Sequence, residues 1–89
     1  MTDRPDEYYV GRLIGRVRLL IATSDDIPVE TKLETQPMLK ELEIGLLAPL
    51  GQQDEERAQG QYSFLLDKLD EYPDVQALLL ALKNFVSYL

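Results

Sequence analysis

Apolar residues recur three and four positions apart along most of this chain, and that spacing decides what the chain can fold into. At the 100° per residue of an α-helix, residues spaced in this way fall on one face. No segment alternates apolar and polar residues over more than a few positions, and no Asn-Gly or Asp-Gly pair marks a hairpin turn. The pattern therefore predicts an all-α fold, a small bundle of helices that forms a single domain over residues 1–89.

The first predicted helix spans roughly residues 5–22. Pro5 suits a first helical turn because it has no N–H to lose, and the polar run at 23–26 favours a turn. The residues expected to face the core are Val10, Leu13, Ile14, Val17, Leu20 and Ile21.

The spacing is less regular between residues 27 and 50. Pro28 is suited to open a helix that carries Val29 and Leu33 inward. Pro37 disfavours the helical conformation at the residue before it, so the segment is either one kinked helix or two short ones. The inward residues expected in the second half are Leu39, Leu42 and Leu46. The bundle therefore has four helices, or five if the chain splits at Pro37.

Two further helices are predicted, one with the acidic run 54–56 at its start and one starting at Pro73 or Asp74. Gly60 lies inside the third helix at a cost of about 1 kcal/mol relative to Ala, which a close helix contact would explain. The third apolar stripe is Ala58, Tyr62, Leu65, Leu66, Leu69 and Tyr72. The fourth, expected to continue as helix to the end of the chain, is Val75, Leu78, Leu79, Leu82, Phe85, Val86 and Leu89.

The last predicted helix is also apolar on its opposite side. That side carries Ala77, Leu80, Ala81 and Tyr88. A helix that is hydrophobic nearly all round is buried on both sides, and so short a chain has little left to cover the second side. We expect Leu80, Ala81 and Tyr88 to contact another molecule.

Small residues line a second candidate surface on the first helix. Gly11, Gly15 and Ala22 form a strip away from the main stripe, flanked by Tyr8 and Leu19. Small residues let two helix backbones approach closely. Either a partner or dimer helix docks on this strip, or the strip packs against a neighbouring helix of the same chain.

Charge is unevenly divided along the chain. Sixteen acidic and nine basic residues give a net charge of −7, but residues 1–24 alone carry a net charge of +1. Arg12, Arg16 and Arg18 either pair with acids of neighbouring helices or belong to a binding surface, for which the planar guanidinium is well suited.

The acidic remainder of the chain has two interpretations. Its densest residues are Asp54, Glu55, Glu56, Asp67, Asp70, Glu71 and Asp74. They are either solvated or they imitate nucleic acid in the groove of a basic protein. Direct binding of nucleic acid is disfavoured because an acidic body repels phosphates.

Composition excludes most catalytic chemistry. The chain contains no Cys, His or Trp, so thiolate and imidazole nucleophiles, bases and metal ligands are absent. No Gly-rich phosphate loop is present, and the acids at 67–74 lack the spacing of a calcium loop. We therefore expect no enzymatic activity, no cofactor and no bound metal.

No membrane segment or secretory signal is expected either. The longest apolar run, 77–82, is far shorter than the roughly 20 residues of a membrane span, and residues 1–7 are polar and acidic. These features favour a cytoplasmic protein.

The function expected from these features is a non-enzymatic module that binds another protein. In general character such small acidic helical proteins resemble accessory proteins of phages and mobile elements, including inhibitors of bacterial defence systems. That resemblance implies action by steric blocking or by nucleic-acid mimicry, with a basic nucleic-acid-binding protein as one candidate partner. The alternative is a structural subunit or small chaperone that assembles as a homo-oligomer, most simply a dimer, through helix burial.

Overall fold

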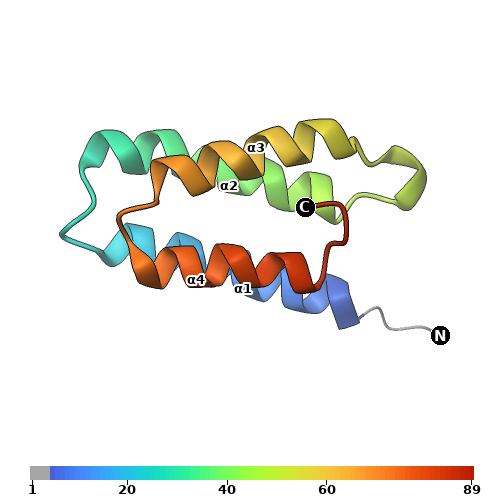
Figure 1. Cartoon of the computed structure of the whole chain (residues 1–89), viewed down its shortest axis with the longest axis horizontal. Coiled ribbons are helices and arrows are strands. Elements are labelled where there is room, and N and C mark those ends of the chain that lie inside the picture. The colour runs from blue at the N-terminus through green and yellow to red at the C-terminus, as the bar shows by residue number, and fades with distance from the viewer. Residues whose placement is uncertain (1–4) are drawn as a thin grey trace.

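Four helices make up most of residues 5–89, the part of the chain that the computed structural model describes (Figure 1). They are α1 (Pro5–Thr23), α2 (Val29–Leu46), α3 (Glu55–Lys68) and α4 (Pro73–Ala81), with short 3-10 turns η1 (Leu50–Gln52) and η2 (Leu82–Asn84). No strand occurs within these residues, so the predicted all-α bundle is confirmed. The expectation that no secretory signal opens the chain rested on residues 1–7, of which residues 1–4 lie outside the described range.

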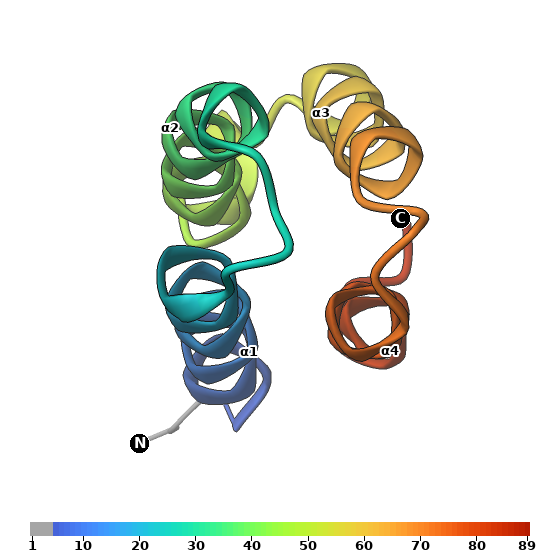
Figure 2. The ribbon, with the colours of Figure 1, turned by 90° about the vertical axis from the view of Figure 1, so that its left-hand side faces the viewer.

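Consecutive helices run in opposite directions and close into a ring around one core. Viewed end-on, α1 and α2 form one side of the bundle and α3 and α4 form the other (Figure 2). Close approaches link α1 to α2, α2 to α3 and α1 to α4. The fourth edge, between α3 and α4, is closed mainly by side chains. Gln76 Nε2 donates to the Leu66 carbonyl at 2.7 Å, and the Tyr62 hydroxyl donates to the Leu79 carbonyl.

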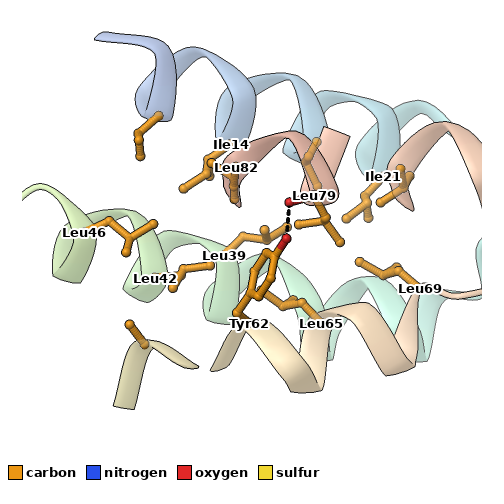
Figure 3. Packing of buried hydrophobic residues seen from close by; sticks show 14 of the residues in the cluster. Ile14, Ile21, Leu39, Leu42, Leu46, Tyr62, Leu65, Leu69, Leu79 and Leu82 are labelled. Atoms are coloured by element: carbon orange, nitrogen blue, oxygen red, sulfur yellow. Dashed lines mark hydrogen bonds between the residues drawn. The ribbon is translucent and has the colours of Figure 1, made fainter. Parts of the chain in front are cut away.

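The apolar stripes predicted for α1, for α3 and for the second half of α2 face the core, as expected. Figure 3 shows Ile14 and Ile21 from α1 meeting Leu39 and Leu42 from α2 and Leu65 from α3. All five side chains are fully buried. Burying a Leu or Ile completely contributes about 1.5–3 kcal/mol, so this cluster is the main source of stability.

Helix α2 runs through Pro37 without interruption, which settles the choice between four helices and five in favour of four. Pro37 is exposed, so its ring disturbs no packing. The helix also has contacts on both sides of the proline. Buried Thr35 donates its hydroxyl to the Thr31 carbonyl at 2.7 Å, and buried Leu39 and Leu42 anchor the following turns. Tertiary packing therefore outweighs the local preference of the proline.

One consequence is that the inward placement predicted for Val29 and Leu33 is wrong. These side chains are 69% and 70% exposed. In two separate helices each half could turn its own apolar residues to the core. In one continuous helix the register is shared, and the burial of Leu39, Leu42 and Leu46 turns Val29 and Leu33 outward.

The last helix is shorter than predicted. It ends at Ala81, and the chain then turns through η2 and folds back toward α3, contrary to the expectation of helix to Leu89 (Figure 1). This turn lets Phe85 stack on Tyr9 of α1, with ring centroids 5.1 Å apart. It also brings Tyr88 to Gln53, whose Oε1 accepts from the tyrosine hydroxyl at 2.9 Å. The contacts of Phe85 and Tyr88 take the place of the backbone hydrogen bonds that a helix continuing to Leu89 would form.

Candidate functional site

The solvent side of α2 carries a row of apolar residues, which we call the α2 outer face: Val29, Leu33, Pro37 and Ile44. Val29, Leu33 and Ile44 are between 63% and 70% exposed, and Pro37 is exposed as well. Spacings of four, four and seven residues keep them on one side of the helix, opposite the buried Leu39 and its neighbours. Lys40 lies among them and is exposed. The α2 outer face is therefore an apolar surface exposed to solvent.

A groove of about 430 Å³ borders this face where α2 passes α1, and we call it the α1–α2 groove. Its apolar walls are Ala22 of α1 and Leu33 and Pro37 of α2. The remaining lining residues are Arg18, Lys32, Gln36 and Lys40. Three of these four are cationic and none is acidic, although the chain as a whole carries a net charge of −7.

Hydrogen bonds between α1 and α2 hold the lining of the groove in place. Arg18 Nε donates to Gln36 Oε1 at 3.0 Å, while Gln36 Nε2 donates to the Arg18 carbonyl at 2.8 Å. Lys32 Nζ donates to the Ala22 carbonyl at 3.3 Å, close to the end of α1. A cation at a helix C-terminus is favoured by the helix dipole. Two of the three cations that line the groove, Arg18 and Lys32, are therefore held by hydrogen bonds between the two helices.

The residues predicted on the first helix are only partly brought together. Tyr8 is exposed and accepts a hydrogen bond at 2.8 Å from Arg12 of its own helix, whose guanidinium also lies over the ring. Arg16 is exposed, and Arg18 alone of the three predicted arginines lines the groove.

The small-residue strip divides between the two interpretations left open by the sequence. A Cβ at Gly11 would lie 3.6 Å from the Glu43 carboxylate of α2, so this end packs internally. A Cβ at Gly15 would meet nothing within 4 Å, so the middle of the strip is open. The close helix contact predicted at Gly60 is wrong, because a Cβ added at Gly60 would meet nothing within 4 Å.

The residues predicted on the last helix do not share one face. Leu80 is 49% exposed and Ala81 is half-buried, both on α4. Tyr88 lies beyond the turn, partly buried against the core, where its carbonyl accepts a hydrogen bond at 2.6 Å from Gln59. Because the helix ends at Ala81, Tyr88 closes the edge beside α3 and does not extend a surface with Leu80.

The predicted acidic residues are exposed and belong to α3, to its N-cap, to the α3–α4 connection and to the first turn of α4. Asp54 caps α3, since its Oδ1 accepts the Arg57 N–H at 3.1 Å. The other six are Glu55, Glu56, Asp67, Asp70, Glu71 and Asp74. Within residues 5–89 no group of three acidic side chains converges as metal ligands would. Mimicry of nucleic acid by these residues stays a prediction.

Two tyrosines have perturbed pKa values for structural reasons. Burial raises the pKa of Tyr62 to about 12, and its hydroxyl donates to the Leu79 carbonyl (Figure 3). Burial also raises the pKa of Tyr88, with a smaller contribution from the negative charge of Glu55. The Tyr62 phenol joins α3 to α4, the Tyr88 phenol joins the C-terminal turn to Gln53 just before α3, and neither lines the α1–α2 groove.

No protein-family model matches the chain, and neither the curated proteins nor the solved structures contain a match to it. None of the helices among residues 5–89 combines the length and the apolar character of a membrane span. The candidate site therefore stands on its own geometry.

The site residues predicted from the sequence did not include Leu33, Pro37, Ile44, Lys32 and Lys40. A signal for all of these except Lys32 was present, because residues 29, 33, 37, 40 and 44 share one helical face if α2 is continuous. That shared face could not be assigned from the sequence, because Pro37 left open whether this segment is one helix or two.

Proposed function

We propose that this chain is a non-enzymatic module that binds another protein through the α2 outer face. The observation that carries the proposal is the exposure of three aliphatic side chains and a proline in one row, on a helix whose other side is fully packed. Single exposed apolar residues are ordinary, but aligned ones mark interaction sites. Shielding this row from water would favour association with a partner.

The energetics of α2 support the same conclusion. A proline inside a helix costs up to about 3 kcal/mol, and Val29, Leu33 and Ile44 contribute little burial to the isolated bundle in return. Natural sequences depart from the locally best residue mostly where function requires it. The proline and the exposed aliphatic residues of α2 are such departures, and they lie on the α2 outer face and along the groove beside it.

The chemistry of the surface supports binding without turnover. The groove offers apolar walls, an amide and three cations, with no nucleophile paired with a base. A module of this kind acts by occupying a surface of its partner. Steric blocking of that partner is then the simplest mechanism by which the chain would inhibit it.

Site-specific photo-cross-linking in cells of the native host tests the proposal. A photoreactive phenylalanine analogue is placed at residue 33 or 44 on the α2 outer face, and at residue 80 on α4 as the matched control. Leu80 is also large, apolar and half exposed, so it controls for general stickiness. We expect one defined protein adduct from positions 33 and 44 and none from position 80. Equal adducts at all three positions, or none at 33 and 44, would refute the proposed function.

A further inference from the structure

The α1–α2 groove has a charge opposite to that of the whole molecule, and this contrast specifies its occupant. Building on the proposed function, we infer that the groove binds an acidic amphipathic helix of the partner protein. The partner helix presents aliphatic or aromatic side chains to Ala22, Leu33 and Pro37, and its carboxylates face Arg18, Lys32 and Lys40.

Charge complementarity carries the first step. The cations Arg18, Lys32 and Lys40 line the groove and no carboxylate does. Arg18 and Lys32 are fixed by their hydrogen bonds to Gln36 and to the Ala22 carbonyl. Ordered cations around an apolar wall favour acidic ligands and disfavour basic ones, which is how charged interfaces select partners.

The dimensions of the groove fit a helix. Lys32 and Lys40 are eight residues apart on α2, which at 1.5 Å per residue corresponds to about 12 Å along the helix axis. Two turns of a docked helix span about 11 Å, so anchors at positions i, i+4 and i+7 face the apolar wall.

Two other occupants fit less well. A second copy related by a two-fold axis would place the same three cations against each other, because such an interface pairs one patch with itself. Nucleic acid would meet a body with a net charge of −7, and the groove between the cations is apolar.

Binding of a designed peptide to the full chain tests the inference. The probe is a synthetic helix of about 18 residues, long enough to be partly ordered alone, with Leu at i, i+4, i+7 and i+11 and Glu on both flanks. The control peptide has Lys at every Glu position. Amide chemical shifts of the isotope-labelled protein report affinity and location. We expect shifts confined to Arg18, Ala22 and residues 32–40 with the Glu peptide, at least about tenfold weaker binding of the Lys peptide, and weaker Glu-peptide binding as salt rises.

Variants separate the groove from general effects. Lys40→Glu removes a cation whose side chain is exposed, so folding should be unaffected, and we expect about tenfold weaker binding of the Glu peptide. Lys83→Glu is the matched control, because Lys83 is also exposed but lies on η2, and binding should be unchanged. Leu33→Ser should abolish binding while Leu80→Ser should not.

The inference is overturned if both peptides bind equally, if neither binds, or if the shifts lie outside the groove. It is also overturned if light scattering shows a dimer that Leu33→Ser dissociates, since a second copy would then be the occupant. In each case cross-links from positions 33 and 44 to a host protein would leave the proposed function intact, whereas their absence would refute that function separately.

Discussion

The Tyr62 phenol offers the sharpest test of how the α3–α4 edge is held. Tyr62 is 2% exposed, and its hydroxyl donates to the Leu79 carbonyl across this edge. Burial raises its pKa from 10.0 to about 12. In the unfolded chain the phenol ionises near pH 10, so between pH 10 and 12 the unfolded state releases a proton that the folded state retains. The stabilising contribution is therefore complete below pH 10 and is lost as pH rises toward 12.

Tyr62→Phe should lower the stability of the folded chain below pH 10 and raise it at pH 12. At pH 8 the variant lacks one hydrogen bond and should be less stable by about 1 kcal/mol. The loss is small because the Leu79 carbonyl still accepts the Leu82 N–H. Two pKa units correspond to about 3 kcal/mol, of which the wild type has lost about 2 kcal/mol by pH 12 while the variant has lost none. The variant should thus be the more stable protein at pH 12, by about 1 kcal/mol, with a crossing between pH 10 and 12.

Urea denaturation followed by far-ultraviolet circular dichroism at a series of pH values measures both stability curves. The spectrum at pH 8 without urea is the control, since it must show that the variant is folded and helical. Stability curves that stay parallel from pH 8 to pH 12 would mean that the Tyr62 phenol ionises as readily in the folded chain as in the unfolded one. The account of this edge would then be wrong.

Three further substitutions test the packing, each by its urea midpoint at constant m-value. Leu42→Ala removes a fully buried side chain and should lower the free energy of unfolding by about 2–5 kcal/mol, so a loss below about 1 kcal/mol would contradict its central place in the core. Gly60→Ala places a Cβ in open space within α3 and should stabilise by about 1 kcal/mol, whereas destabilisation would show a contact there. Pro37→Ala restores a helical hydrogen bond and should stabilise by about 1–3 kcal/mol, whereas a loss of stability would show that the ring packs against the fold.

The parts of the fold that were predictable are those in which one helical period runs unbroken. The stripes from Val10 to Ile21 and from Ala58 to Leu69 repeat without interruption, and their buried faces are as predicted. Local sequence could not show that packing around Leu39 and Leu42 carries α2 through Pro37, because that outcome depends on residues from other helices. Nor could it show where the last helix ends, since contacts of Phe85 and Tyr88 with distant residues decide this.

The same limits explain the result for the candidate site. Arg18 was identified from the local excess of positive charge on the first helix, which is visible in the sequence. Lys32 and Lys40 were not, because acids lie within two residues of each along the chain and only the register of α2 brings them to one groove with Arg18. Predicting a site that two helices share requires the inward and outward faces of both helices, and the sequence left those of α2 undecided.

Residues 33 and 35 of α2 show most directly that stability alone does not account for this helix. Thr35 is completely buried, while Leu33, two positions away, is 70% exposed. Packing alone favours the opposite arrangement, because burying a leucine contributes about 1.5–3 kcal/mol, whereas a buried hydroxyl must be given a hydrogen bond, here to the Thr31 carbonyl. Exposed aliphatic residues opposite a buried hydroxyl are therefore a cost to the isolated bundle, and covering them would remove that cost. The proposed partner would supply such a covering surface, with acidic side chains facing Arg18, Lys32 and Lys40.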